Sequence, residues 1–238
     1  MIFNFKTISS IFFPQKCLSC FLYTKNQELL CNDCLQKLTI HNDFVCIKCY
    51  KPINVFKNEH CHGIEDFKIN SLLYCLDYRN KIVKEIIHQF KYQRLLTLQT
   101  TFKLILKQSL QPYKTFFKKH DYILIPVPLS IQRKRTRGFN QADVLAKLIS
   151  KILNIPYYPN ILIRYKNNSP QANIENQIQR SQNVKNIFKL NSKKLKFLKN
   201  KNIILVDDVF TTGSTLNECA KILKQNKVKN ILVICLAH

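Results

Sequence analysis

Residues 202–215 read NIILVDDVFTTGST, and this stretch constrains the fold of the chain more than any other. Its apolar run, 203–206, is uninterrupted, which is typical of a strand buried on both faces of a parallel sheet. Two aspartates follow directly, and a short cluster of Thr, Gly and Ser then leads into a helical pattern from about 214 to 226. Because ligands bind beyond the carboxyl ends of such strands, the stretch predicts a binding site at the end of a central strand.

Strand and helix patterns alternate through residues 69–238. Apolar runs predict the strands, and one segment has the period of an amphipathic helix. A second helix is expected after Asn140, which can act as its N-cap. The polar segment 166–186, rich in Asn and Gln, is interpreted as a long loop. The pattern predicts an α/β domain whose parallel sheet is covered by helices on both faces. The expected strands are 72–76, 121–128, 160–165 and 230–237, and the first helix is 82–90.

Most of the ten cysteines lie near the N-terminus, where they form CxxC pairs. Two such pairs supply four thiolates, which is the full ligand set of a tetrahedral structural zinc ion. Without a metal, a segment this short and poor in glycine has too little core to fold alone. We therefore predict a small zinc-binding domain over residues 1–68, before the α/β domain of residues 69–238. Its first ligand set is Cys17, Cys20, Cys31 and Cys34.

A second zinc site is expected around the third CxxC pair. Ile64 stands where the last cysteine of such a site is expected, so a histidine would supply the fourth ligand. The alternative is a site that has lost its metal. The cysteines at 75, 219 and 235 lie in apolar segments, and we expect them to be small core residues. The expected ligands are Cys46, Cys49, Cys61 and His62, with His60 as the alternative to His62.

The net charge of +24 is carried almost entirely by the second domain. Residues 1–68 contain 8 basic and 6 acidic side chains, so residues 69–238 contain the other 30 and 8 and carry +22. A field this positive attracts polyanions, either phosphorylated metabolites or nucleic acid.

No stretch of the sequence approaches the roughly 20 apolar residues of a membrane span. The first 14 residues are apolar but lack the small-residue cleavage site of a signal peptide, and we expect a docking helix there. Cysteines arranged as metal ligands indicate a reducing compartment. We therefore expect a cytoplasmic protein.

The residues after the apolar run suit the two ends of a ribose 5-phosphate. The carboxylates of Asp207 and Asp208 can accept hydrogen bonds from the vicinal hydroxyls of a ribose. Backbone N–H groups at the start of the following helix, with nearby hydroxyls, form a cradle for phosphate. The alternative is that the two aspartates only cap the following turn. The expected phosphate-binding residues are Thr211, Thr212, Gly213, Ser214 and Thr215.

The stretch IILVDDVFTTGST resembles the motif with which type I phosphoribosyltransferases bind phosphoribosyl diphosphate (PRPP). The rest of the chain resembles the ComF family, which is also grouped with GntX and consists of competence-associated proteins with a phosphoribosyltransferase-like domain. The resemblance covers essentially all 238 residues. Beside the N-terminal cysteine pairs, it is carried by YRNKIVKEIIHQFKYQ, IPVPLSIQRKRTRGFNQADVLA and SPQANIENQIQRSQNVKNIF.

The resemblance implies a PRPP-dependent transferase in which pyrophosphate leaves the anomeric carbon and a nitrogen nucleophile of an unknown acceptor attacks it. Magnesium would bridge the diphosphate and the ribose hydroxyls. Asp207 and Asp208 would hold the hydroxyls, and residues 211–215 would hold the 5-phosphate. The polar loop resembles the hood that closes over the substrate. The diphosphate contacts of the family would fall on Val127, Pro128, Leu129, Arg137 and Lys91, and its hood positions on Gln171, Arg180 and Asn183.

A second hypothesis is a non-catalytic binding module that reuses this fold in DNA uptake. It would handle incoming single-stranded DNA or act with a competence helicase or recombination proteins, a link that the resemblance implies. The basic run 132–138, QRKRTRG, fits DNA as well as PRPP. Aromatic side chains that can stack on bases are Phe139, Tyr165 and Phe188, although core packing suits Phe188 better.

Overall fold

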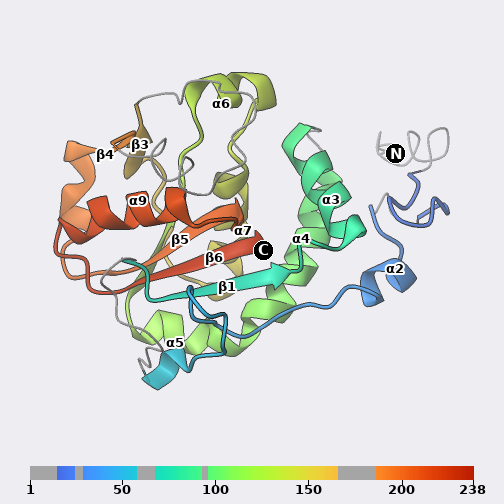
Figure 1. Cartoon of the computed structure of the whole chain (residues 1–238), viewed down its shortest axis with the longest axis horizontal. Helices are drawn as coiled ribbons and strands as arrows, with labels where there is room; N and C mark the ends of the chain where they lie inside the picture. The colour runs from blue at the N-terminus through green and yellow to red at the C-terminus, as the bar shows by residue number, and fades with distance from the viewer. Residues whose placement is uncertain (1–14, 25–28, 58–67, 93–95, 166–185) are drawn as a thin grey trace, which may run out of the picture.

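The computed structural model describes residues 15–24, 29–57, 68–92, 96–165 and 186–238 (Figure 1). Several features expected from the sequence lie outside these residues. They are the docking helix at the N-terminus, the second-site ligands Cys61 and His62 with the alternative His60, and the hood positions Gln171, Arg180 and Asn183.

A four-stranded parallel sheet forms the centre of the second domain, as the sequence predicts (Figure 1). The strand order is β1–β6–β5–β2, so β5, which carries the two aspartates, has a neighbour on each side. β5 extends to Val209 because its pairing with β6 continues through Asp207 opposite Cys235 and Val209 opposite Ala237. The two aspartates therefore belong to the strand itself. The strand bounds are β1 Ser71–Leu76, β2 Tyr122–Pro126, β5 Asn202–Val209 and β6 Ile231–Ala237.

Helices cover both faces of the sheet. On one face, buried side chains of α3, α4, α5 and α7 pack against alternate strand residues such as Ile204 and Ile234. On the other face, α9 packs against the intervening residues, such as Ile203 and Val233. This division follows from the two-residue period of a strand. The helices are α3 Lys81–Tyr92, α4 Leu96–Leu110, α5 Lys114–Lys119, α7 Gln141–Leu153 and α9 Ser214–Lys224, and the short η3 Gln111–Tyr113 connects α4 to α5.

The strand expected at 160–165 does not join the parallel sheet. Its central residues form β3 (Leu162–Arg164), which pairs antiparallel with β4 (Phe188–Leu190) in a separate two-stranded ribbon. The segments before and after the polar segment therefore lie side by side in opposite directions. The amide of Tyr165 donates to the carbonyl oxygen of Ile187 at 3.0 Å. The ribbon packs on α9, and η4 (Ser192–Phe197) leads from it to β5.

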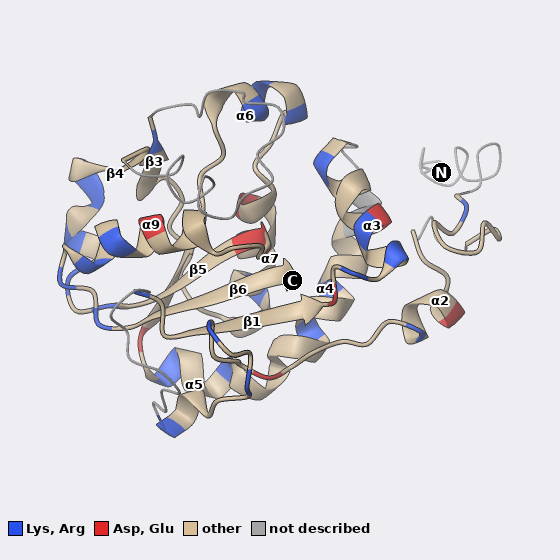
Figure 2. Cartoon of the chain, in the orientation of Figure 1, with Lys and Arg blue, Asp and Glu red and all other residues tan. Residues whose placement is uncertain are grey.

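The basic run QRKRTRG belongs to a helix, α6 (Ile131–Arg137), that the sequence patterns did not predict. Ser130 caps this helix, because its hydroxyl accepts a hydrogen bond from the amide of Arg133 at 3.3 Å. Gly138 ends the helix with φ of 79°, a left-handed conformation that favours glycine. The side chains of α6 are exposed or half-buried, so the helix presents its lysines and arginines to solvent (Figure 2).

Two turns of the same geometry carry the first and third CxxC pairs. In residues 17–22 the amide of Cys17 donates to the carbonyl oxygen of Leu22, and the carbonyl oxygen of Cys17 accepts from the amide of Phe21. Residues 46–51 repeat these two bonds, and Phe21 and Tyr50 share a positive φ of 59° and 58°. The second CxxC pair lies at the start of α2 (Asn32–Gln36), and η2 (Val55–Lys57) follows the third.

Residues near the third pair dock the zinc-binding region onto the sheet. Val45 exchanges two backbone hydrogen bonds with Leu72, at 2.8 and 3.0 Å, so the chain lies along the outer edge of β1. This pairing covers an edge strand that would otherwise expose its backbone groups. Residues 58–67, next to the expected boundary between 68 and 69, lie outside the described residues, and that boundary stays a prediction. None of the described helices has the length and apolar character that a bilayer crossing requires.

Candidate functional site

The aspartate pair lies at the carboxyl end of β5, beside the end of α3. The Oδ1 atom of Asp207 accepts a hydrogen bond from the amide of Asp208 at 2.9 Å, and Oδ1 of Asp208 accepts from the amide of Val209 at 2.8 Å. The second oxygen of Asp208, Oδ2, lies 3.5 Å from Nζ of Lys91. One oxygen of each acid thus binds an amide of its own strand, whereas the alternative expected both acids to cap the turn that follows. The other oxygen of Asp208 faces a cation from α3.

The two carboxylates affect each other's charge. Burial raises the pKa of the Asp207 carboxyl well above its ordinary value, and the neighbouring charge of Asp208 raises it further. The amide of Asp208 and the cation of Lys91 act in the opposite direction. Asp207 therefore holds a proton more tightly than an exposed aspartate, and a bound cation would favour its ionised form.

The residues expected to bind phosphate form a turn between β5 and α9. The amide of Phe210 donates to the carbonyl oxygen of Ala237 at 2.9 Å, which fixes the start of the turn to β6. Gly213 has φ of 70° and precedes the first residue of α9, while the hydroxyls of Thr212 and Ser214 lie 2.9 Å apart. The first amides of a helix have no intrahelical partner, and the helix dipole favours an anion there. The turn therefore supplies donors of the kind that a phosphate group needs.

Of the two cations expected at the diphosphate, Lys91 lies at this strand end, and Arg137 is linked to the end of α3. Lys91 is 23% exposed and is the partner of Asp208. The guanidinium of Arg137 lies 5.7 Å from the ring centroid of Tyr92, and its Nη1 donates to Oε1 of Gln141 at 3.2 Å. Gln141 in turn donates from Nε2 to the carbonyl oxygen of Lys91 at 3.5 Å. The structure thus brings Lys91 and Arg137 together through one shared neighbour.

The segment expected to act as the diphosphate loop also meets this site. The amide of Val127 donates to the carbonyl oxygen of Val206 at 2.9 Å, immediately before the aspartate pair. The carbonyl oxygen of Val127 accepts from Nδ2 of Asn140 at 3.0 Å. Asn140 occupies the N-cap position of α7 as predicted, but its side chain makes no cap hydrogen bond. It holds the segment of Val127 and Pro128 instead.

Two side chains near the site were missed by sequence reasoning. Gln141 is only 2% exposed, yet a glutamine at the start of a helix carries no signal that it will be buried. Arg164 lies on β3, where its guanidinium is 5.6 Å from the ring centroid of Phe188. Burial, with the charge of Arg133, lowers the pKa of Arg164, while Asp207 acts in the opposite direction. Only the ribbon fold brings the charge of Arg164 within reach of Asp207.

The first set of cysteines forms a compact cluster, as predicted. The sulfur atoms of Cys17, Cys20, Cys31 and Cys34 all lie within 4.8 Å of one another. A tetrahedron with Zn–S bonds of roughly 2.3 Å places sulfurs about 3.8 Å apart, and those of Cys20 and Cys31 are 3.7 Å apart. The donor set and its spacing fit a zinc ion whose four positions are all filled by protein.

Backbone donors favour the thiolate form of Cys17, whereas burial and the neighbouring thiols raise the pKa of Cys20 and Cys31. Sγ of Cys17 accepts hydrogen bonds from the amides of Ser19 and Cys31 at 3.5 and 3.4 Å. Burial alone would raise the pKa of Cys17, but the backbone amides of Cys20, Cys31 and Ser19, with the Cys20 thiol, outweigh it and lower the pKa to about 6. Thiolates are the form that binds zinc, so the turn prepares its cysteine for metal. The second cluster is only half described: Cys46 and Cys49 lie in the matching turn, and their expected partners lie outside the described residues.

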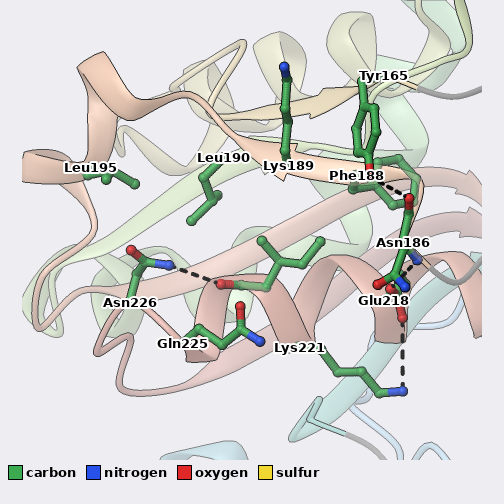
Figure 3. A pocket seen from close by; sticks show the side chains of 11 residues that line it. Tyr165, Asn186, Phe188, Lys189, Leu190, Leu195, Glu218, Lys221, Gln225 and Asn226 are labelled. Carbon is green, nitrogen blue, oxygen red and sulfur yellow. Dashed lines mark hydrogen bonds and ion pairs between the residues drawn. The ribbon is translucent and has the colours of Figure 1, made fainter.

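A pocket of about 620 Å³ lies between the β3–β4 ribbon and α9 (Figure 3). Its lining includes the apolar Phe188 and Ile222 and the cations Lys189 and Lys221. Tyr165 keeps 43% of its surface exposed, and Nζ of Lys189 lies 5.5 Å from its ring centroid. Of the three aromatics expected to stack on bases, Phe188 is buried, and Phe139 packs against the core beside Phe90. Tyr165 is therefore the best placed of the three.

Comparison with known proteins gives matches in both parts of the chain. A family model for the phosphoribosyl transferase domain matches residues 140–238, and one for the double zinc ribbon domain matches residues 8–65. Competence protein F of Haemophilus influenzae is 34% identical over 226 residues, covering 82% of this chain and 97% of its own. Competence protein ComFC of Bacillus subtilis is 29% identical, covering 87% and 83%. The DNA utilization protein YhgH of Escherichia coli K12 is 27% identical, covering 93% and 89%.

Proposed function

The chain belongs to the family of competence protein F, and on that premise we propose that it binds PRPP at the carboxyl end of β5 and transfers the phosphoribosyl group to an acceptor. The observation that carries the proposal is the approach of Lys91 to Asp208, with Nζ and Oδ2 3.5 Å apart. It places a cation suited to diphosphate beside an acid suited to ribose hydroxyls, one short turn before the N-terminus of α9.

Each part of the site has a role in this proposal. Asp207 and Asp208 accept hydrogen bonds from the two ribose hydroxyls, and the amides and hydroxyls of residues 211–215 hold the 5-phosphate. Lys91 and Arg137 contact the diphosphate, and the arginine fork can bind two of its oxygens at once. The segment of Val127 and Pro128 borders the diphosphate.

The chemistry is displacement at the anomeric carbon. The bond from that carbon to the diphosphate oxygen breaks and its electron pair leaves with pyrophosphate, while a nitrogen of the acceptor forms the new bond and gives up a proton. Lysine and arginine stabilise the charge that develops on the leaving group. Magnesium, a cation that prefers carboxylate and phosphate oxygens, would neutralise further charge there. The two adjacent carboxylates fit such an ion.

The names of the relatives suggest the setting of this reaction. Two are competence proteins and one is a DNA utilization protein, so we propose that the chain acts in the uptake or use of DNA, in the cytoplasm. A reducing compartment would keep the four clustered thiols available for zinc.

Calorimetry tests the binding step. PRPP added to the purified chain with magnesium should release or absorb heat, and this signal should disappear in the double variant Asp207→Asn with Asp208→Asn. Asp121→Asn is a matched control, because Asp121 pairs with Lys201 on the surface and away from this strand end. An unchanged signal in the double variant, or none in the native chain, would contradict the proposal.

A second candidate function is binding of single-stranded DNA, favoured by the pocket beside Tyr165. An exposed tyrosine with the lysine Lys189 over its ring is a unit that can stack one base and hold its phosphate. The charge of +22 on residues 69–238 would add a sequence-independent attraction.

Fluorescence anisotropy with a labelled oligothymidine distinguishes the two candidates. Tyr165→Ala should weaken binding by about tenfold, since stacking on an aromatic side chain contributes roughly 1–3 kcal/mol per base. Tyr23→Ala is the matched control, because Tyr23 is 66% exposed and also lies near a lysine, Lys16, but in the zinc-binding region. Equal effects of the two variants would contradict a DNA site at this pocket. Competition by PRPP would show that the oligonucleotide occupies the site at the end of β5 instead.

A further inference from the structure

The first turn of α7 connects three segments that meet at the candidate diphosphate site. Oε1 of Gln141 accepts a hydrogen bond from Nη1 of Arg137 at 3.2 Å, and its Nε2 donates to the carbonyl oxygen of Lys91 at 3.5 Å. The preceding residue, Asn140, donates from Nδ2 to the carbonyl oxygen of Val127 at 3.0 Å. Two adjacent amide side chains therefore hold the end of α3, the end of α6 and the segment after β2.

Gln141 is nearly fully buried, with 2% of its surface exposed. A buried amide side chain costs stability unless its oxygen and nitrogen both find partners. Here the partners are a cationic side chain and a carbonyl group in the last turn of α3, where helices leave carbonyl groups without an intrahelical partner. The burial of Gln141 is thus compensated by the same two contacts that join α3 to α6.

Arg137 needs such support. It is the last residue of α6, a short helix without a buried side chain. A long side chain on such an exposed helix loses conformational freedom when it binds a ligand, and this loss weakens affinity. The ring of Tyr92 and the oxygen of Gln141 hold its guanidinium in one place before any ligand arrives.

Resting on the proposed function, we infer that Gln141 is a positioning residue for the diphosphate group of PRPP. It joins the backbone of Lys91 to the guanidinium of Arg137, so that the two cations are presented together. Gln141 does not itself contact the ligand. Its contribution is to remove the cost of ordering two separate segments at the moment of binding.

The inference predicts a selective effect on ligands. Ribose 5-phosphate shares the hydroxyls and the 5-phosphate of PRPP but has no diphosphate. Gln141→Met keeps the length of the side chain and removes both hydrogen bonds. We expect this variant to bind PRPP and pyrophosphate about tenfold more weakly, since hydrogen bonds to charged groups are among the stronger ones, and to bind ribose 5-phosphate as the native chain does. Titration calorimetry with the three ligands in the presence of magnesium measures all of these affinities.

A double-mutant cycle with Arg137→Met tests whether Gln141 acts through Arg137. Residues that work as one unit give non-additive effects, so Gln141→Met should change PRPP affinity less in the Arg137→Met background than in the native one. Gln108→Met, an exposed glutamine on α4, controls for the substitution itself. If Gln141→Met does not fold, Arg137→Met alone must still show the selective loss of PRPP and pyrophosphate binding.

Three results would overturn the inference. The first is no change in PRPP affinity on Gln141→Met. The second is an equal loss for ribose 5-phosphate with a lowered melting temperature, which indicates a role in stability alone. The third is full additivity with Arg137→Met. If the native chain binds neither PRPP nor ribose 5-phosphate, the proposed function itself fails, and the inference fails with it.

Discussion

Acidic groups lie close together at two sites of this molecule, the cysteine cluster and the aspartate pair. The charge is compensated differently at each. In the zinc-binding region, four thiols lie within 4.8 Å of one another, two on the turn at residues 17–22 and two at the start of α2. At the end of β5, two carboxylates are adjacent on one strand. Each accepts a backbone amide, and Lys91 lies 3.5 Å from Asp208. The cysteines can share one metal ion, whereas the aspartates divide their contacts between their own strand and α3.

Under the proposed function, this difference distinguishes a structural site from a binding site. Four protein sulfurs complete the coordination of zinc and leave no open position for a ligand. The pKa of Asp207 stays raised because the charge of Lys91 and the amide of Asp208 do not offset burial and the repulsion from Asp208. An incompletely neutralised pair of acids favours a further cation or a set of hydroxyl donors. The four predictions that follow test this contrast, from the largest expected effect to the smallest.

Removing zinc should have the largest effect, and it should stay local. A chelator, or Cys34→Ser, should abolish amide protection in residues 17–24 and 29–38, because structural zinc contributes on the order of 10 kcal/mol to folding in small zinc domains. Residues 203–209 should stay protected, since their strand is held by the parallel sheet. Hydrogen exchange with mass spectrometry measures both segments, and returning zinc should restore the first. Protection that survives chelation would show that the cluster is not a metal site.

Changing Lys91 should have an intermediate effect, confined to the other site. Lys91→Met removes the cation beside Asp208, and we expect PRPP affinity to fall by tenfold or more, as for a lost hydrogen bond to a charged group. The zinc content, measured by atomic emission, should not change. An unaltered affinity would mean that Lys91 serves only to neutralise Asp208.

The raised pKa of Asp207 predicts a smaller effect on stability, with a definite sign. The folded chain binds the proton of this carboxyl more tightly than the unfolded chain does. The tighter binding of this proton therefore contributes fully to the free energy of unfolding below the ordinary aspartate pKa of about 3.9. This contribution is lost as the pH rises through the raised pKa. Asp207→Asn should accordingly raise the free energy of unfolding by roughly 0.5–2 kcal/mol at pH 8 and change it little near pH 4. Denaturant unfolding at both pH values measures this difference. A variant less stable than the native chain at pH 8 would contradict the view that the ionised Asp207 destabilises the fold.

The smallest effect is expected at Asp77, a half-buried acid that has a partner of its own. Hydrogen bonds from the Arg79 guanidinium, with the Arg79 amide, lower the pKa of Asp77 to about 2. Its contribution to stability is present above the ordinary aspartate pKa and is lost as the pH falls through about 2, the opposite sign to Asp207. Arg79→Met should return the pKa of Asp77 toward the ordinary value of about 3.9. A carbon-detected NMR titration follows this carboxyl, and an unchanged pKa would show that the backbone amide alone sets it.

The sequence predicted the sheet better than its surroundings. The apolar runs at 72–76, 121–128, 203–206 and 230–237 all form parallel strands. A strand buried on both faces is apolar throughout, so each run could be recognised without knowing its partners. The length of β5 was underestimated, since its last residues are fixed by pairing with β6 rather than by their own polarity. The strand at 160–165 was assigned to the wrong sheet, because an antiparallel partner 26 residues later depends on how the chain returns.

At the candidate site, local motifs were predictable and distant contacts were not. The resemblance named Lys91 and Arg137, but the contact of Lys91 with Asp208 joins residues more than a hundred positions apart. Gln141 and Arg164 escaped notice because each gains its neighbours only from tertiary packing. Asn140 was expected to bond its own helix, and the nearby carbonyl oxygen of Val127 competed successfully for its amide. The second zinc site and the hood stay predictions.

The strand order has a consequence for the order of events during translation. β1 emerges from the ribosome early, but its parallel partner β6 is made some 150 residues later. In the interval, Val45 can already form its two hydrogen bonds with Leu72 on the opposite edge of β1. A metal-loaded N-terminal region is thus suited to shield the nascent strand from wrong partners until the last segment completes the sheet.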